Sequence, residues 1–155
     1  MPKGRPASKT HSEGGEAFTK LVLETFRLNG RFIVEGDRLT KGIGLSSARW
    51  QVLGTLRESD TPLTVAQIAR NMGLQRQSVQ RTVDIMCREG LLRMAVNPRH
   101  RRAKLVVMTS KGETVARRAT RLQIAWANEV AAGIEPEEME AARSTLHKLR
   151  QRLTE

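Results

Sequence analysis

The sequence predicts a mainly α-helical fold that carries one small β-hairpin. Apolar residues recur at helical spacing in several stretches of the chain. Helix-capping residues and glycines separate these stretches from one another. Two strand-like runs, residues 91–96 and 104–108, flank a turn that contains Pro and several Arg residues. The predicted order is four helices, the hairpin and two further helices, with no internal repeat.

The N-terminal third of the chain predicts a tail and two helices. Residues 1–12 are polar and hold three positive and no negative charges, so we expect a disordered basic tail. Helical spacing over residues 15–43 predicts one long helix, whose propensity Gly30 and Gly36 lower. Ser46 is expected to cap the second helix.

Two short helices joined by a glycine come next. Thr64 and Gln67 have the spacing of a capping box, and Gly73 has the place of a helix-ending glycine. A further helix is expected over residues 76–89. Ala69 supplies the small side chain that two steeply crossing helices need, which predicts a helix-turn-helix. The apolar residues expected to be buried around it are Ile68, Met72, Leu74, Val79 and Val83.

Charge is distributed unevenly along the chain. The 155 residues hold 27 Lys and Arg against 16 acidic residues, a net charge of +11. Residues 61–111 hold ten basic and two acidic side chains, so +8 of this excess lies in one third of the sequence. Such a block is typical of a surface that binds a polyanion. Aromatic residues make up only 3% and Tyr is absent, which disfavours proteins that read single strands or RNA by stacking.

One face of the helix predicted over residues 76–89 is polar and basic. Arg pairs well with guanine and Gln with adenine in the major groove of duplex DNA. We therefore expect Arg76, Gln77, Gln80 and Arg81 near base edges, and Ser78 on a phosphate. A solvated polar face is the alternative interpretation.

The turn of the predicted hairpin is strongly basic. Pro98 is followed by Arg99, His100, Arg101 and Arg102. A turn with this composition cannot belong to a core, and it indicates a wing that lies along the DNA backbone with an Arg in the minor groove. The alternative is a flexible charged surface loop.

Two helices are predicted after the hairpin. Ser110 and Glu113 have the spacing of a capping box, and Pro136 opens the last helix. Apolar residues of this last helix alternate at three- and four-residue steps, as in a coiled coil, so we expect a homodimer rather than packing of the two end helices within one chain. The residues expected at the dimer contact are Phe18, Leu21, Val22, Met139, Ala142, Leu146, Leu149 and Leu153.

Four segments resemble the MarR (multiple antibiotic resistance regulator) family of winged-helix regulators. They are GLSSARWQVL, LTVAQIARNMGLQRQSVQRTVDIM, REGLLRM and NPRHRRAKLVVMTSKG, and the resemblance covers nearly the whole chain after the tail. The chain departs from the family pattern at Asn97, where family members usually have an Asp that braces a wing Arg by a salt bridge.

This resemblance implies a domain plan and a function. The plan is a winged helix-turn-helix over residues 46–109, with dimerisation segments over residues 13–45 and 110–155. The implied function is a homodimeric transcriptional repressor on an inverted-repeat operator, with half-sites roughly 10 bp apart. Many family members release DNA when a small aromatic or anionic ligand binds. The candidate ligand-binding residues here, whose apolar members are better interpreted as core, are Arg27, Asn29, Phe32, Ile33, Arg49, Trp50 and Leu53.

Other functions are less well supported by the residues. Cys87 lies next to Arg88, which would lower its pKa and suit a redox switch, although an idle thiol is the better interpretation. An RNA-binding winged helix is a further alternative. No nucleophile–base pair, phosphate loop or metal-ligand spacing indicates an enzyme, a cofactor or a metal site. A single Cys and the lack of a signal peptide or apolar span predict a cytoplasmic protein without membrane contact.

Overall fold

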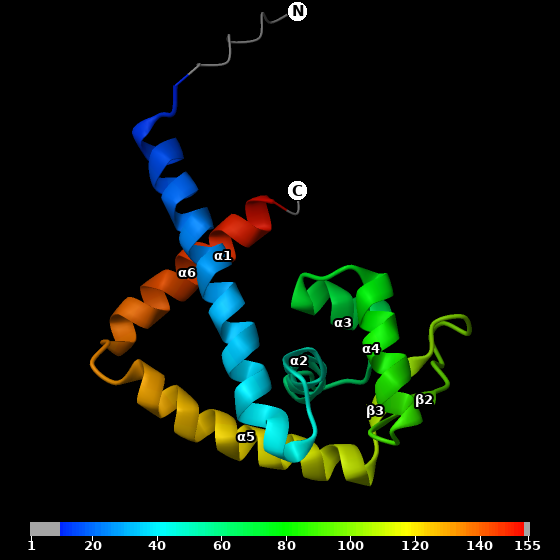
Figure 1. Ribbon diagram of the computed structural model, residues 1–155. Helices are drawn as coiled ribbons and strands as arrows, with labels where there is room; N and C mark the ends of the chain where they lie inside the picture. The colour runs from blue at the N-terminus through cyan, green and yellow to red at the C-terminus, as the bar shows by residue number, and fades with distance from the viewer. Residues whose placement is uncertain (1–9, 154–155) are drawn as a thin grey trace, which may run out of the picture. The chain divides into compact units, whose positions relative to one another are not determined.

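The computed structural model describes residues 10–153, and it confirms the mainly helical fold with a small antiparallel sheet (Figure 1). Contacts within the chain divide it into two compact units, one ending at Ala119 and one beginning at Thr120. The elements are α1 (Glu13–Thr40), the 3-10 helix η1 (Lys41–Ile43), α2 (Ser47–Arg57), β1 (Leu63–Thr64), α3 (Val65–Met72), α4 (Arg76–Arg88), β2 (Leu92–Ala95), β3 (Leu105–Met108), α5 (Ser110–Ala131) and α6 (Pro136–Arg152).

The long first helix is confirmed, and it continues without a break through Gly30 and Gly36. The predicted basic tail lies outside the described residues up to position 9, and Ser12 at its end caps α1 by accepting a hydrogen bond from the amide of Gly15 at 3.1 Å. Gly36 is required by packing, because a Cβ there would lie 2.9 Å from Oγ of Ser47 on α2. This glycine therefore lets α1 and α2 approach closely.

Most predicted helix ends are confirmed by hydrogen bonds. Ser46 caps α2, and the capping box of Thr64 and Gln67 is present, with the Thr64 amide donating to Oε1 of Gln67 at 2.8 Å. Gly73 ends α3 at a φ of 66°, in the left-handed region that glycine tolerates best. The prediction that Ser110 caps the fifth helix was wrong by one residue.

The residue that caps α5 is Thr109. Its Oγ1 accepts a hydrogen bond from the amide of Gly112 at 3.1 Å, so Ser110 is already the first helical residue. The same hydroxyl donates to the carbonyl of Gly90 at 2.6 Å. The acceptor of this second bond lies 19 residues away in sequence, so local spacing does not reveal it. Local spacing alone therefore predicted Ser110 as the capping residue.

The sheet has three strands in the order β1-β3-β2, all antiparallel. The hairpin of β2 and β3 is confirmed, with Met94 opposite Val106. Strand β1 was not predicted. It pairs Leu63 with Val106, and two residues are too few to show an alternating pattern.

The core of the first unit lies between α2, α3, α4 and the sheet. Val79, Val83 and Met86 of α4 are buried in it, as is Ala69 of α3. Leu74 was expected among these residues, but it is 47% exposed because it lies in the turn after Gly73, outside the helix pair. The buried apolar face of α4 fixes which of its side chains point to solvent.

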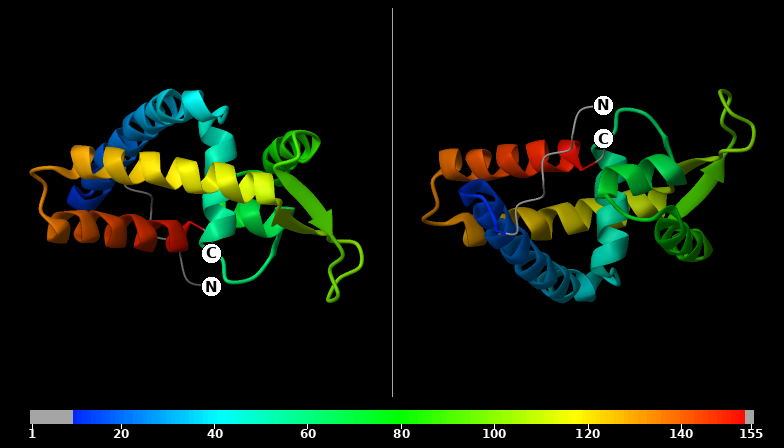
Figure 2. Two further views of the ribbon diagram at one scale, coloured as in Figure 1. Left: turned by 90° about the horizontal axis from the view of Figure 1, so that it is seen from below. Right: turned by 90° about the horizontal axis from the view of Figure 1, so that it is seen from above.

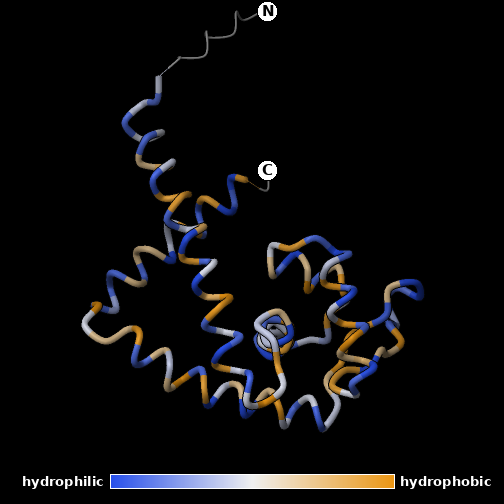
Figure 3. The backbone as a smooth tube through the Cα atoms, in the orientation of Figure 1, coloured by the Kyte–Doolittle hydropathy of each residue, from blue (hydrophilic) through white to orange (hydrophobic). Residues whose placement is uncertain are grey.

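The second unit consists of the last part of α5 and the helix α6. Pro136 lies in the first turn of α6, as predicted, and none of its residues is buried. Figure 3 shows apolar residues distributed along these helices as well as along α1. The large exposed apolar residues of this unit are Ile124, Val130, Ile134, Met139, Leu146 and Leu153. Across residues 10–153, no helix is both long and apolar enough to cross a membrane.

Candidate nucleic-acid interface

Helix α4 presents a polar face opposite its buried apolar face. Arg76, Gln77, Ser78 and Arg81 are exposed, and Gln80 is half-buried at the edge of this face. The structure thus brings all five predicted residues to the outward side of one helix. Two Gln and two Arg side chains on a solvent-facing helix can donate and accept the hydrogen bonds that base edges offer.

One acidic residue on α4 orients a predicted base-reading side chain. Nε2 of Gln80 donates a hydrogen bond to Oδ1 of Asp84 at 2.8 Å, one helical turn along α4. The bond leaves Oε1 and the second N–H of Gln80 available. Asp84 was not among the predicted site residues, although its i,i+4 spacing from Gln80 is the available sequence signal.

The two ends of α4 are held differently. At the N-terminus, Gln75 makes no side-chain capping bond to the helix. At the C-terminus, Arg49 of α2 forms an ion pair with Glu89 at 2.9 Å, and Nζ of Lys111 donates to the Glu89 carbonyl at 2.8 Å. The C-terminal end is therefore anchored to α2 and α5, while the N-terminal amides face outward with the positive end of the helix dipole.

The turn of the hairpin is organised by Asn97. Its Nδ2 donates to the carbonyl of Ala103 at 2.9 Å, and its Oδ1 accepts from the amide of Arg99 at 3.0 Å. The amide of His100 also donates to the Asn97 carbonyl at 3.2 Å. The Asn97 side chain and backbone therefore link the two ends of the turn by hydrogen bonds.

The predicted wing residues Arg99, His100, Arg101 and Arg102 are all exposed. None of them takes part in the ion pairs found within residues 10–153. Both views of Figure 2 show the hairpin tip projecting beyond α3 and α4. The tip thus presents unpaired positive charge at the outer edge of the first unit.

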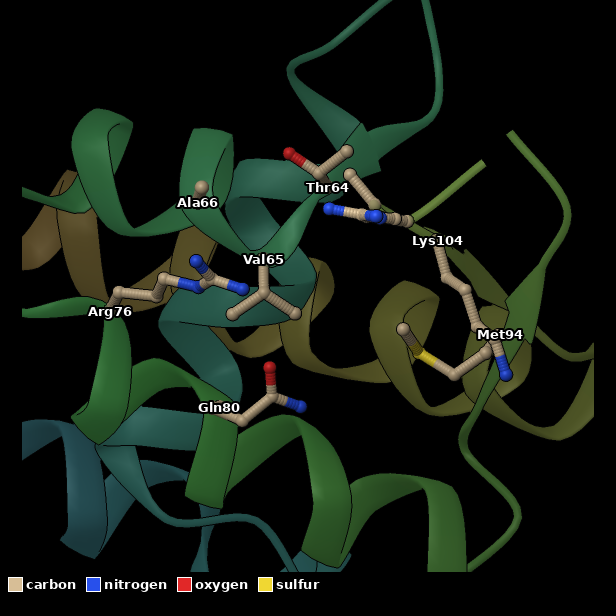
Figure 4. A pocket seen from close by; sticks show the side chains of 9 residues that line it. Thr64, Val65, Ala66, Arg76, Gln80, Met94 and Lys104 are labelled. Carbon is tan, nitrogen blue, oxygen red and sulfur yellow. The ribbon is translucent and has the colours of Figure 1, made fainter. Parts of the chain in front are cut away.

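An open hollow of about 260 Å³ lies between the start of α3, the start of α4 and the hairpin (Figure 4). We call it the cationic hollow, because three of its lining residues carry positive charge and none carries negative charge. Its lining residues are Thr64, Val65, Ala66, Arg76, Gln80, Met94, Arg102, Ala103 and Lys104. It connects the outward face of α4 with the hairpin.

Comparison with known proteins assigns this arrangement to a family. A sequence model described as "MarR family" matches residues 43–103, the segment from η1 to the hairpin turn. An uncharacterized protein of Mycobacterium tuberculosis, Rv2011c, is 34% identical over 134 residues, which cover 86% of this chain and 92% of that protein. The chain belongs to the MarR family. It is a DNA-binding transcriptional regulator.

Other MarR-type proteins are similar to this chain along most of its length. The transcriptional activatory protein BadR of Rhodopseudomonas palustris is 27% identical, covering 74% of this chain and 67% of BadR. The solved structure of the transcriptional regulator PA3341 is 28% identical, with a TM-score of 0.75 over 88% of this chain and 98% of its own. CouR of Rhodococcus jostii RHA1, solved with p-coumaroyl-CoA, has a TM-score of 0.75 at 22% identity, covering 83% of this chain and 90% of its own.

The residues proposed from the MarR-family resemblance for a ligand site lie in different surroundings. Leu53 is 1% exposed within the core, and Trp50 packs against that core. Arg49 is engaged with Glu89. The remaining four lie exposed on α1, where Arg27 pairs with Glu24; they are Arg27, Asn29, Phe32 and Ile33.

The environment of Cys87 does not suit a reactive thiol. Burial raises the pKa of this half-buried thiol, and the nearby Asp84 carboxylate raises it further. The expectation that Arg88 would lower this pKa was wrong, because desolvation and Asp84 dominate. Within residues 10–153, no group of three or more His, Cys, Asp or Glu side chains is placed to hold a metal ion.

Proposed function

We propose that this MarR-family protein is a homodimeric repressor that binds an inverted-repeat operator. Each α4 would enter the major groove and each hairpin would reach the adjacent minor groove. The observation that carries the proposal is the polar face of α4 in the same unit as a hydrogen-bonded turn whose cationic side chains form no ion pair within residues 10–153. Such a pair combines base readout with backbone positioning.

The contacts within the groove follow from the outward face of α4. Gln77, Gln80 and Arg81 would meet base edges, with Gln80 held in place by Asp84. Ser78 would contact a phosphate, since hydroxyl groups commonly bind backbone oxygens. The cationic side chains of the hairpin turn would follow the backbone and the minor groove.

Exposed apolar side chains support the homodimer. On α1, Phe18 is 40% and Phe26 is 69% exposed, and on α6, Met139 and Leu146 are each 41% exposed. Apolar faces of this length are typical of surfaces that a partner covers. A second copy of the chain is the proposed partner, because the three- and four-residue spacing on α6 suits pairing of helices.

A small ligand would release the protein from DNA by favouring a different separation of the two α4 helices. CouR, which is similar in fold, binds p-coumaroyl-CoA, an aromatic and anionic molecule. We propose an aromatic and anionic ligand for this chain too, with Phe32 and Ile33 of α1 as apolar contacts and Arg27 as the partner of its anionic group. Such a ligand would have to bind the released arrangement of the two α4 helices more tightly than the DNA-binding arrangement.

Selection of bound DNA from a random duplex pool tests the operator. We expect an inverted repeat with half-sites roughly 10 bp apart, one helical turn. Insertion of about half a turn between the half-sites should abolish tight binding, because both α4 helices could no longer face the same side of the duplex. Enrichment of single half-sites bound by one chain would contradict the homodimer. A selected site that activates a downstream promoter would make the protein an activator, as BadR is named.

Truncation after Glu138 tests the dimer separately. Removal of the apolar residues of α6 should give monomers in light scattering and poor affinity for the selected site. Replacement of exposed polar residues of the same helix, such as Lys148→Ala, serves as the control and should leave the dimer intact. A truncated chain that remained a stable dimer would contradict the role of α6.

A further inference from the structure

The cationic hollow lies directly beside the core of the first unit. Lys104 immediately precedes β3 and lines the hollow, and Val106, two residues further on, belongs to the core. Val106 is buried, while Met94, its partner across the hairpin, is 37% exposed and lines the hollow. The hollow is thus the open end of the inner sheet face, where the apolar core gives way to charged side chains.

Positive side chains reach this hollow from two separate elements. Figure 4 shows Arg76 and Gln80 approaching from α4, with Met94 and Lys104 on the hairpin side. Arg102 adds a third cation from the hairpin turn. None of the three cations belongs to an ion pair found within residues 10–153, so their charges are not neutralised by carboxylates of this part of the chain.

Two helices begin at the hollow and add to its positive potential. Val65 and Ala66 are the first residues of α3, and Arg76 is the first residue of α4. First-turn N–H groups point out of a helix with no acceptor inside it, and anions bind there. The Thr64 hydroxyl is occupied by Gln67, whereas α4 has no side-chain cap at all.

We propose that a phosphate of the DNA backbone occupies the cationic hollow, held by Arg76, Arg102 and Lys104. This inference rests on the proposed function, since it places the duplex against α4 and the hairpin together. The volume of about 260 Å³ accommodates a phosphodiester group with part of its hydration, given roughly 30 Å³ for each water. A tetrahedral dianion or diester suits several donors that converge from different elements.

The proposal changes the assignment of one predicted residue and adds another. Arg76 was expected near a base edge, but here it binds the backbone. Lys104 joins the interface although it lies outside the predicted site. A single phosphate held by α4 and the hairpin at once would fix the angle between them, so the hollow sets the register of base readout without touching a base.

A double-mutant cycle between the protein and the DNA tests this contact. Single methylphosphonates, which are neutral, are placed at successive positions of a selected site, and affinity is measured for the wild type and for Lys104→Ala. In the wild type, a methylphosphonate at one position in each half-site should weaken binding about tenfold. The same methylphosphonate should weaken binding of Lys104→Ala by less than about twofold, because the contact that it removes is already lost. The control is Arg93→Ala, an exposed cation on the outer face of β2, for which the two effects should multiply.

The outcomes separate this inference from the function on which it rests. Normal DNA binding with multiplicative effects of Lys104→Ala at every position would overturn the phosphate contact and leave the DNA-binding function intact. Absence of binding to any selected duplex would overturn the function itself.

A second arm tests the source of the phosphate with inorganic phosphate alone, followed by amide shifts of Thr64, Val65 and Ala66. Weak, millimolar shifts that Lys104→Ala removes would support the site. Tight binding of inorganic phosphate without coupling to any DNA phosphate would overturn the backbone assignment in favour of a free anion.

Discussion

Nδ2 of Asn97 donates a hydrogen bond to the carbonyl of Ala103 at 2.9 Å, across the turn of the hairpin. Oδ1 of the same Asn97 side chain accepts a hydrogen bond from the backbone N–H of Arg99 at 3.0 Å. A carboxylate can accept but cannot donate, so the Asp usual in the MarR family could make only the second of these bonds. The Asn97 side chain therefore bridges the turn and leaves the Arg99 guanidinium without a bracing carboxylate.

Replacement Asn97→Asp should weaken DNA binding about three- to tenfold, because the lost hydrogen bond is worth roughly 1 kcal/mol. The new carboxylate would also face the Ala103 carbonyl oxygen and attract Arg99 away from DNA. Fluorescence anisotropy on the selected site measures the affinity, and hydrogen exchange of the Arg99 amide reports the order of the turn. The control is Val96→Ala, since Val96 is 82% exposed in the same hairpin. An Asn97→Ala variant with wild-type affinity would refute the role of this amide.

Replacement Arg99→Ala should weaken binding to all duplexes and lower the slope of log affinity against log salt by about one unit for each bound chain. The reason is that a cation on a phosphate releases one condensed counterion. Arg118→Ala removes the same charge from α5 away from the hairpin and should leave the slope unchanged. If Arg99→Ala leaves both affinity and slope unchanged, the hairpin does not contact DNA.

Local signals in the sequence predicted the scaffold of the site. The capping box of Thr64 and Gln67, the glycine at 73 and the basic turn are all encoded within a few residues, and each is present in the structure. What the sequence did not predict depends on segments brought together by folding. Strand β1 exists only because β3 pairs with it, and Lys104 lines the cationic hollow only because the hairpin lies beside α4.

Replacement Asp84→Ala should change the affinity for DNA and the discrimination between base sequences in opposite directions. Loss of a negative charge should raise affinity for random duplex about twofold, whereas loss of the bond to Gln80 should cost roughly 1 kcal/mol of discrimination at one base pair. Competition assays with selected and scrambled duplexes measure both quantities. Glu58→Ala, which removes an exposed acid from the end of α2, is the charge control. Unchanged discrimination in Asp84→Ala would show that Gln80 does not depend on Asp84.

The Cys87 thiol should stay protonated at pH values where an ordinary thiol ionises, because burial and Asp84 raise its pKa. The folded chain binds this proton more tightly than the unfolded chain does. The stabilisation that comes from this proton is therefore complete at pH values below the pKa of the thiol in the unfolded chain. It is lost as the pH rises through the pKa of the thiol in the folded chain. Alkylation at pH 8 should be slower than for a model thiol, and Cys87→Ser should bind DNA normally with or without peroxide. Release from DNA by peroxide in the wild type alone would restore the redox switch.

The most direct test of sequence reading by α4 is the affinity of Arg81→Ala for its selected site and for random duplex at one stated salt concentration. We predict a loss of roughly 1–3 kcal/mol on the selected site, with relaxed preference at one base pair and little change on random duplex. The exposed position of Arg81 makes a folding defect unexpected, and a thermal melt checks it. An equal loss on both duplexes would assign Arg81 to the backbone and contradict base readout by this helix.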